Sequence, residues 1–498
     1  MAKKNTRKRH VSKSIIDLSD PELFGNDAGE DEKPEILASY FVNQLSFDRF
    51  LDRQASFSIA RARKGMGKSA LLKKLEYDLK RTHQRVLVVH ATPVTLAAIA
   101  EPPSIDDHVL LENYWKQAIC ALINVEIGRS IGFALSDTEI SMVEASELAG
   151  FKGKNIVGSL VARLSGKLGP IEIEAQGTPK AIPALQRFME DHGQAVWLLL
   201  DDIDSRFVNT PLNHTRVATF FSACRSLINE VSDLYIRATV RTDVWANLTH
   251  AEDLDKCEQY VADIRWTANQ QDTILTKKII AYVQRKFPQS HEAKTWTIEK
   301  NASEIVSLAF LKRMSWGDHS VPPYHPIRIL SAGRPRWMSQ LCRLAGNQAK
   351  ANGESHIGIQ QINQVMGIYG RSRLDDLYKE HNHQYGDLKG LVEAFSGGPR
   401  RYTTEQLLDK ILHDYSGRVG VRNLPLIDGY PYKELYQLAH FLFKCGFIAG
   451  HNSQKPTLAV PEFVTFEQRP ELLTTRINPD DGMMWEIQPS YRQVLRIH

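Results

Sequence analysis

The sequence predicts an α/β protein whose core is a parallel sheet, followed by a helical region and a small C-terminal domain. Apolar runs that suit buried strands alternate with helical patterns in the first half of the chain, at 57–60, 85–91, 196–200 and 234–240, with a weaker run at 260–266. This alternation is typical of a parallel sheet covered by helices. Helical pattern dominates from about residue 270, and from about residue 400 short helices alternate with short strand patterns.

These patterns divide the chain into five parts. The first ten residues hold five basic side chains, for which a solvated tail and a contact with nucleic acid are both open interpretations. The predicted parts are a flexible arm with basic and then acidic charge (1–35), an α/β core with an insertion at about 101–180 (36–268), a helical lid (269–395), a winged-helix-like domain (396–470) and a C-terminal tail (471–498). Within the insertion, 108–129 has helical periodicity and 150–177 suggests a hairpin or loop.

The composition excludes several other classes of protein. Hydrophobic residues make up 42% and charged residues 24%, so the chain has enough apolar material for buried cores and is not disordered as a whole. No uninterrupted apolar run approaches the roughly 18 residues that a membrane span needs. The five cysteines show no CxxC spacing, which argues against a zinc site or a disulfide framework. We therefore expect a cytoplasmic protein with no membrane partner.

The most specific motif is Ala62-Arg-Lys-Gly-Met-Gly-Lys-Ser69, which follows a predicted strand and precedes a predicted helix. Glycines in this loop let backbone N–H groups approach phosphates, and the start of the helix adds a partial positive charge. We expect Lys68 to contact the β- and γ-phosphates and the Ser69 hydroxyl to bind magnesium. The motif departs from GxxxxGK[ST] at its first glycine, which is Ala62 here. The residues expected at the phosphates are Arg63, Lys64, Gly65, Met66, Gly67, Lys68, Ser69 and Ala70.

The second motif is an apolar run that ends in acids, Val196-Trp-Leu-Leu-Leu-Asp-Asp-Ile-Asp204. A buried parallel strand places such acids at the carboxyl edge of the sheet, where ligands bind. We expect Asp201 to hold magnesium through water. Asp202 stands where many ATPases have a glutamate that orients the attacking water, and its shorter side chain predicts slow hydrolysis. For Asp204, a helix N-cap role and a catalytic role are both open.

Two further motifs supply arginines. In Ala238-Thr-Val-Arg-Thr-Asp243, Thr239 and Arg241 share one face of a strand and are expected beside the γ-phosphate, although a strand-end arginine is often a surface or ion-pair residue. The helix start Gly333-Arg-Pro-Arg336 presents Arg334 and Arg336 in its first turn. Either arginine is expected to reach the nucleotide, the alternative being contact with solvent or aspartates. We expect catalytic roles for Lys68, Asp202 and Arg241, and nucleotide contacts from Thr239, Pro335 and Arg336.

In this order, the four motifs resemble those of additional-strand P-loop ATPases, that is, AAA+ ATPases and their STAND and KAP relatives. Asp201–Asp204 is similar to the double-aspartate motif of KAP and STAND proteins, Thr239-Val-Arg241 to the sensor of NB-ARC ATPases, and Gly333-Arg-Pro335 to the lid-helix segment. Residues 260–266 and 369–377 are also similar to an uncharacterised prokaryotic P-loop ATPase family often encoded beside anti-phage effectors. That family resemblance covers about 37–465.

The resemblance implies an ATPase core, a helical lid and a winged helix, with ATP and Mg²⁺ as cofactors between core and lid. It also implies a homo-oligomer and a partner protein that acts as effector or sensor. Arg225 is the candidate for an arginine that acts in a neighbouring subunit.

Three functions are compatible with these motifs. The main hypothesis is a slowly hydrolysing regulatory ATPase that controls a partner effector in anti-phage defence. The alternative is a DNA-binding AAA+ ATPase of the replication-initiator or transposition-helper type, against which the candidate recognition helix 432–445 carries only Lys433 and Lys444 as basic groups. The third, suggested by Asp202, is an ATP-locked scaffold with almost no turnover.

Overall fold

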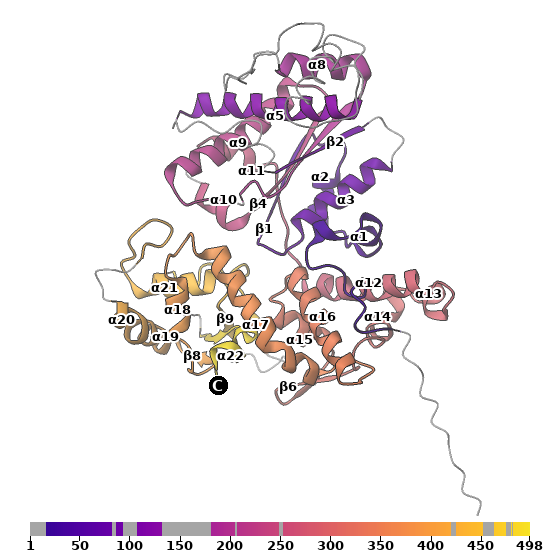
Figure 1. The fold of residues 1–498 in the computed structure, drawn as a ribbon. Coiled ribbons are helices and arrows are strands. Elements are labelled where there is room, and N and C mark those ends of the chain that lie inside the picture. Colours follow the sequence, from indigo (N-terminus) through magenta and orange to yellow (C-terminus); the bar gives the residue numbers. More distant parts are fainter. Residues whose placement is uncertain are drawn as a thin grey trace, which may run out of the picture. The chain divides into compact units, whose positions relative to one another are not determined.

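The computed structural model describes residues 16–81, 86–92, 107–131, 181–204, 207–248, 252–419, 425–451, 463–474, 480 and 482–498. The chain forms two compact units (Figure 1). The core unit comprises Asn43–Arg265 together with 428–430, and the helical unit comprises the residues up to Val42, Trp266–Ile427 and Pro431–His498.

The core unit is built on a five-stranded parallel sheet. Its strands are β1 (Phe57–Ala62), β2 (Val86–Ala91), β3 (Ala195–Leu200), β4 (Leu234–Arg241) and β5 (Val261–Asp263), in the order β2-β3-β4-β1-β5. In this order β4 lies between β3 and β1. The sheet therefore has an additional strand between the strand that precedes the glycine loop and the strand that precedes the acids. The predicted fold class is therefore confirmed for the core, although the fifth strand ends earlier than the run 260–266 suggests.

Helices pack against this sheet through a continuous apolar cluster. These helices are α5 (His108–Ile131), α8 (Ala181–His192), α9 (Pro211–Glu230), α10 (Thr242–Leu248) and α11 (Glu252–Glu258). Two more helices, α2 (Leu45–Leu51) and α3 (Lys68–Lys80), also contact the sheet, but their residues are not part of this cluster. The helix predicted at 108–129 is α5, whose Ile119, Ile123 and Ile127 are fully buried in the cluster. The hairpin or loop predicted at 150–177 lies outside the described residues.

The helical unit begins with helices that surround a second apolar cluster. They are α12 (Ala268–Lys286), α13 (His291–Thr295), α14 (Ile298–Val306), α15 (Tyr324–Leu330), α16 (Pro335–Ala351) and α17 (Ile359–His381), with a hairpin of β6 (Met314–Trp316) and β7 (His319–Val321). Thr267 and Gln270 form a capping box that fixes the start of α12. No helix in the described part of the chain is long and apolar enough to cross a membrane.

The N-terminal segment is part of this unit, so the prediction of a flexible arm is wrong from Ile16 onward. Ile16, Leu18, Leu23 and Phe24 are buried in the second cluster, and a short helix, α1 (Pro34–Tyr40), follows the turn η1 (Gly29–Asp31). The sequence did not predict their burial, because many charged residues surround these four apolar residues in the chain. Residues 1–15, which carry the basic run, lie outside the described residues.

The C-terminal part of the helical unit has a third apolar cluster. Its helical elements are α18 (Leu388–Glu393), α19 (Thr404–Lys410), a π-helical turn (Ile411–Ser416), α20 (Gly417–Val419), α21 (Leu435–Lys444) and α22 (Pro489–Leu495). Its strands are β8 (Arg401–Tyr402), β9 (Ile448–His451), β10 (Phe463–Val464) and β11 (Met484–Ile487), in the antiparallel order β10-β9-β11-β8.

This arrangement is winged-helix-like, with one difference from the prediction. Residues 471–498 are not a separate tail, because β11 pairs with β9 on one side and β8 on the other. Trp485 of β11 is fully buried, and α22 packs against α17. The end of the chain therefore completes the small sheet.

Candidate functional site

The loop from β1 to α3, which carries the predicted phosphate-binding motif and is called the phosphate loop below, has two glycines in an unusual backbone conformation. Gly65 and Gly67 have φ angles of 79° and 101°, in the left-handed region that favours glycine. A Cβ at Gly67 would meet no protein atom within 4 Å, so the protein requires glycine there for its backbone angle and not for space. The loop leads directly into α3, whose N-terminus carries the partial positive charge of a helix start.

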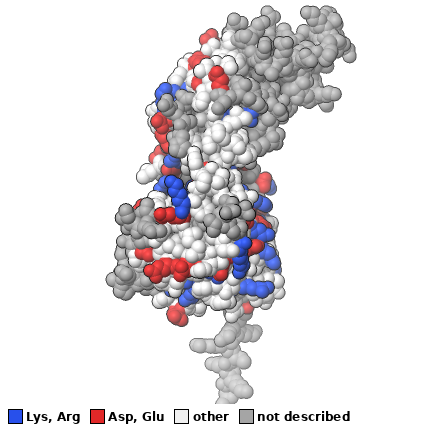
Figure 2. Space-filling view, turned by 90° about the vertical axis from the view of Figure 1, so that its left-hand side faces the viewer, with Lys and Arg blue, Asp and Glu red and all other residues white. Residues whose placement is uncertain are grey.

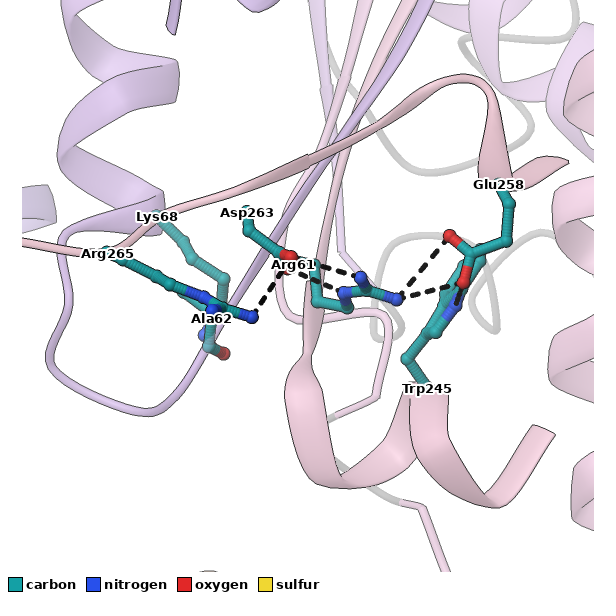
Figure 3. Close-up of polar contacts among 7 residues, drawn as sticks. All are labelled: Arg61, Ala62, Lys68, Trp245, Glu258, Asp263 and Arg265. Carbon is teal, nitrogen blue, oxygen red and sulfur yellow. Dashed lines mark hydrogen bonds and ion pairs between the residues drawn. The ribbon is translucent and has the colours of Figure 1, made fainter. Parts of the chain in front are cut away.

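Lys68 and Ser69 occupy the first turn of α3. Lys68 is buried, and its Nζ donates a hydrogen bond to the carbonyl oxygen of Ala62, 3.3 Å away on the other side of the loop (Figure 3). The other residues predicted at the phosphates are half-buried, both in the loop (Arg63, Lys64, Gly65, Met66 and Gly67) and in the helix (Ser69 and Ala70). The Lys68 side chain therefore links the end of the loop to its beginning.

Asp201 follows β3 and is fixed by its neighbours. Its backbone N–H donates to the carbonyl oxygen of Ala91 at the end of β2, at 3.0 Å. Its carboxylate Oδ1 accepts a 2.6 Å hydrogen bond from the hydroxyl of Thr239 on β4, which is fully buried. The structure therefore brings together two residues that separate sequence motifs predicted at one site.

Asp202 is exposed and has an unusual backbone conformation. Its φ angle is 51°, in the left-handed region, which is uncommon for a residue other than glycine. Its backbone N–H lies 3.1 Å from Oδ1 of Asp201 and 3.3 Å from the Thr239 hydroxyl. The acid predicted to orient water therefore sits on a backbone turn held by the Asp201–Thr239 pair.

Arg241 ends β4 beside the start of the phosphate loop, because its register partner on β1 is Ala62. Its Nε lies 3.1 Å from Oδ2 of Asp204, and the same oxygen accepts the backbone N–H of Arg241 at 2.6 Å. The carbonyl oxygen of Asp204 accepts a further bond from Nη2 at 3.1 Å. Asp204 is therefore an ion-pair partner of Arg241, and the N-cap and catalytic roles that the sequence left open for it are not tested by these contacts.

A second group of charged residues lies beside the loop and was not predicted from the sequence. Arg61 of β1 forms ion pairs with Asp263 of β5 and Glu258 of α11, at 2.7 and 3.1 Å, and Trp245 donates to Glu258 (Figure 3). Burial lowers the pKa of Arg61, but hydrogen bonding with Asp263 and the two acidic charges outweigh it and raise that pKa above its ordinary value. The only sequence signal was a charged residue inside an apolar strand.

In the helical unit, the two arginines at the start of α16 differ. Arg334 is buried, pairs with Glu380 of α17 at 2.6 Å and lies over the ring of Trp337 at 4.2 Å. Arg334 is therefore an ion-pair residue, as in the alternative interpretation of the sequence, but its partner is a glutamate and not an aspartate. Pro335 and Arg336 are half-buried in the first turn, and their contact with nucleotide stays a prediction.

Arg225, the candidate trans-acting arginine, lies half-buried on α9 of the core unit. Its role between subunits stays a prediction.

No family model matches the chain, and no curated protein matches it. The solved structures that align with nearly the whole chain include the following three. The Aeropyrum pernix ORC2 protein in ADPNP–ADP complexes is 12% identical, with a TM-score of 0.40, covering 96% of this chain and 97% of that chain. Its ADP form is 11% identical (TM-score 0.33; 96% of each chain), and Drosophila ORC bound to DNA is 11% identical (TM-score 0.30; 100% of this chain and 96% of that chain). TM-scores of this size do not establish a shared fold, so the fold assignment depends on the strand order and the phosphate loop.

Proposed function

We propose that this chain is a P-loop ATPase that binds ATP with Mg²⁺, hydrolyses it slowly and acts as a regulatory switch. The observation that supports this most strongly is the strand order, because it brings the carboxyl ends of β1, β3 and β4 to one edge of the sheet. That edge carries the phosphate loop, the acids after β3, and Thr239 with Arg241. The direct bond between Thr239 and Asp201 links two of these segments.

The residues present suit a nucleotide with its metal. The Ser69 hydroxyl and the Asp201 carboxylate are oxygen ligands of the kind Mg²⁺ prefers, with water completing its coordination. The metal would neutralise charge on the phosphates. Lys68 and the backbone of the glycine loop would hold the phosphates, and Arg241 would contact the γ-phosphate. Asp202, which is exposed, would orient the water that attacks.

Lys68 provides the first test of this proposal. We expect Lys68→Ala to weaken MgATP binding by about tenfold or more and to abolish hydrolysis, because its ammonium group is the side-chain cation expected at the β- and γ-phosphates. Fluorescent-nucleotide titration and a phosphate-release assay measure the two effects. Lys80→Ala is the matched control, since Lys80 is an exposed lysine at the far end of the same helix. Equal MgATP affinity in both variants would overturn the proposed site.

Asp202 separates the switch from the scaffold hypothesis. We expect Asp202→Asn to bind MgATP like the wild type and to lose about a hundredfold or more in kcat, because the amide cannot accept a proton from water. Single-turnover hydrolysis measures this loss. If the wild type binds MgATP and shows no turnover with any partner protein or DNA, the chain is an ATP-locked scaffold.

The proposed output of the switch is control of a partner effector, and the sequence resemblance suggests anti-phage defence as its setting. Association of subunits is part of this proposal. On the surface drawn in Figure 2, basic and acidic side chains are interspersed among the described residues, which suits a protein partner better than a phosphate backbone.

A DNA-binding ATPase of the initiator type is the second candidate. The winged-helix-like part of the helical unit favours it, since such helices enter DNA grooves in other proteins. Against it, Leu438, Ala439, Phe441, Leu442 and Phe443 of α21 are buried. The ORC structures, one of them bound to DNA, add no argument at their TM-scores. Nanomolar DNA affinity that falls steeply with salt would favour this candidate.

A further inference from the structure

Two polar links join the segment after β3 to the end of β4. In the first, the Thr239 hydroxyl donates to Oδ1 of Asp201. In the second, Arg241 donates three hydrogen bonds to Asp204, two of them to the carboxylate and one to the backbone carbonyl. Thr239 and Arg241 are two residues apart on one strand face, so the links lie side by side.

The second link is built around a buried charge. The Asp204 side chain is only 1% exposed, and that of Arg241 is 16% exposed. A carboxylate at this depth needs a charged or hydrogen-bonding partner, because burying it alone is costly. Among the described residues, its Oδ1 has no hydrogen-bond partner and Oδ2 receives both bonds from Arg241. Arg241 is thus the principal partner of this acid, and the acid fixes how the guanidinium is held.

Asp202 lies between the two links in the chain. Its left-handed backbone, with φ of 51°, is a conformation that persists in a non-glycine residue when the surroundings enforce it. The links fix Asp201 and Asp204 on either side of it. The direction of the Asp202 carboxylate therefore depends on both links.

We infer that Asp204 is a positioning residue for ATP hydrolysis, an inference that rests on the proposed function. Its carboxylate holds Arg241 at the edge of the phosphate loop and, together with the Thr239–Asp201 link, sets the turn that presents Asp202. Asp204 acts through Arg241 and Asp202 and does not touch the nucleotide. It is therefore expected to affect the rate of hydrolysis and not the binding of diphosphate, whose contacts come from the loop after β1.

The test is a double-mutant cycle on the full chain with Asp204→Asn, Arg241→Gln and the pair combined. Asparagine keeps the shape of the side chain and an oxygen for the backbone N–H, but it removes the charge. We expect kcat to fall about tenfold to a hundredfold in Asp204→Asn, as for a misplaced catalytic group. Because both residues act as one unit, the double variant is expected to lose no more than Arg241→Gln alone.

The affinity for MgADP, measured by titration on each variant, separates positioning from loss of structure. We expect its Kd to stay within about twofold of the wild type. If Arg241→Gln fails to fold because Asp204 is left unpaired, the double variant, which has neither charge, still gives the comparison with Asp204→Asn. Asp233→Asn is the matched control, since Asp233 is exposed just before the opposite end of β4 and also has a positive φ angle.

Three results would overturn the inference. A wild-type kcat in Asp204→Asn would show that the charge of Asp204 does not position Arg241 or Asp202. Losses of kcat that add in the double variant would show that Asp204 and Arg241 act independently. Loss of MgADP binding in Asp204→Asn would indicate a purely structural role. Absence of hydrolysis in the wild type is a different result, because it overturns the proposed ATPase function itself.

Discussion

Arg237 is a fully buried arginine in the middle of β4, and its role is to complete a helix end. Its guanidinium donates to the carbonyl oxygens of Phe50, Asp52 and Ala55 at 2.6–2.7 Å. These carbonyls lie at or just beyond the C-terminus of α2, where the helix leaves its carbonyls without intrahelical partners. Burial lowers the pKa of Arg237 to about 9, yet the three bonds keep the group in place.

We expect Arg237→Met to lower the free energy of unfolding by about 2–5 kcal/mol, because it leaves several buried carbonyls without donors. Methionine fills much of the same volume, so lost hydrogen bonds and not a cavity dominate the effect. Urea unfolding followed by circular dichroism measures it. Arg53→Met is the matched control, since Arg53 is exposed and its single described bond, to Asp78, is 3.3 Å long. Equal losses in the two variants would contradict this role for Arg237.

At the residue scale, the sequence could identify groups whose chemistry follows from a motif. Lys68, Asp201 and Thr239 occupy the expected edge of the sheet, because a glycine loop and the polar ends of buried strands have local signatures. Arg237 and the Asp204–Arg241 pair could not be predicted. Their partners come from other parts of the chain, and whether an arginine is buried or exposed depends on packing that no local pattern records.

At the element scale, the segment from Ile16 to Val42 is held in place by a buried lysine. Lys278 of α12 donates from its Nζ to the carbonyl oxygen of Phe24 and the hydroxyl of Ser339, at 2.8 and 2.7 Å. The same ammonium group lies 4.6 Å from the centre of the Tyr40 ring. A Cβ at Gly346 of α16 would lie 2.3 Å from the carbonyl oxygen of Leu18, so only glycine allows this close packing.

Because of Lys278, we expect the free energy of unfolding to depend on pH. Burial lowers its pKa from 10.5 to about 8, against an opposing effect of Glu32. Between these pH values the unfolded chain binds more protons than the folded one, so the contribution of Lys278 to the free energy of unfolding rises with pH. We expect the difference in unfolding free energy between wild type and Lys278→Met to shift in favour of the wild type by up to about 3 kcal/mol from pH 8 to 10.5.

Urea unfolding at several pH values tests this prediction, with Lys350→Met as the control for loss of an exposed lysine. A difference between wild type and Lys278→Met that stays constant over the window would show that Lys278 remains charged when buried. The N-terminal segment would then be held by a charged ammonium group and not by a titrating one.

The sequence was informative about elements where an apolar pattern was long. Strands β1 to β4 and helix α5 were predicted close to their observed bounds, because each buries a continuous apolar run or face. Strand β11 was not predicted, since four residues carry too little pattern and its partners β8 and β9 lie far away in sequence. Ile16 to Phe24 were missed because their few apolar residues are surrounded by charges.

At the scale of the whole molecule, the core unit is inserted into the helical unit. The chain leaves the helical unit after Val42 and returns to it at Trp266. The core unit has one apolar cluster of its own, and the helical unit has two. Because each unit has its own core, we expect the protein to unfold in more than one thermal transition, as multidomain proteins commonly do.

Binding of MgADP can therefore show which unit holds the nucleotide. A ligand that binds only the folded state stabilises it by about 2.7 kcal/mol at a hundred times its Kd, so it raises the transition of the unit that contacts it. The phosphate loop belongs to the core unit, and we expect MgADP at the same concentration to raise one transition in calorimetry of the wild type and to raise it less in Lys68→Ala. The predicted contacts of Pro335 and Arg336 require a second shift, in the transition of the helical unit. Arg336→Gln is then expected to keep the first shift and to reduce the second, whereas a wild type with only one shifted transition would show that the core unit binds the nucleotide alone.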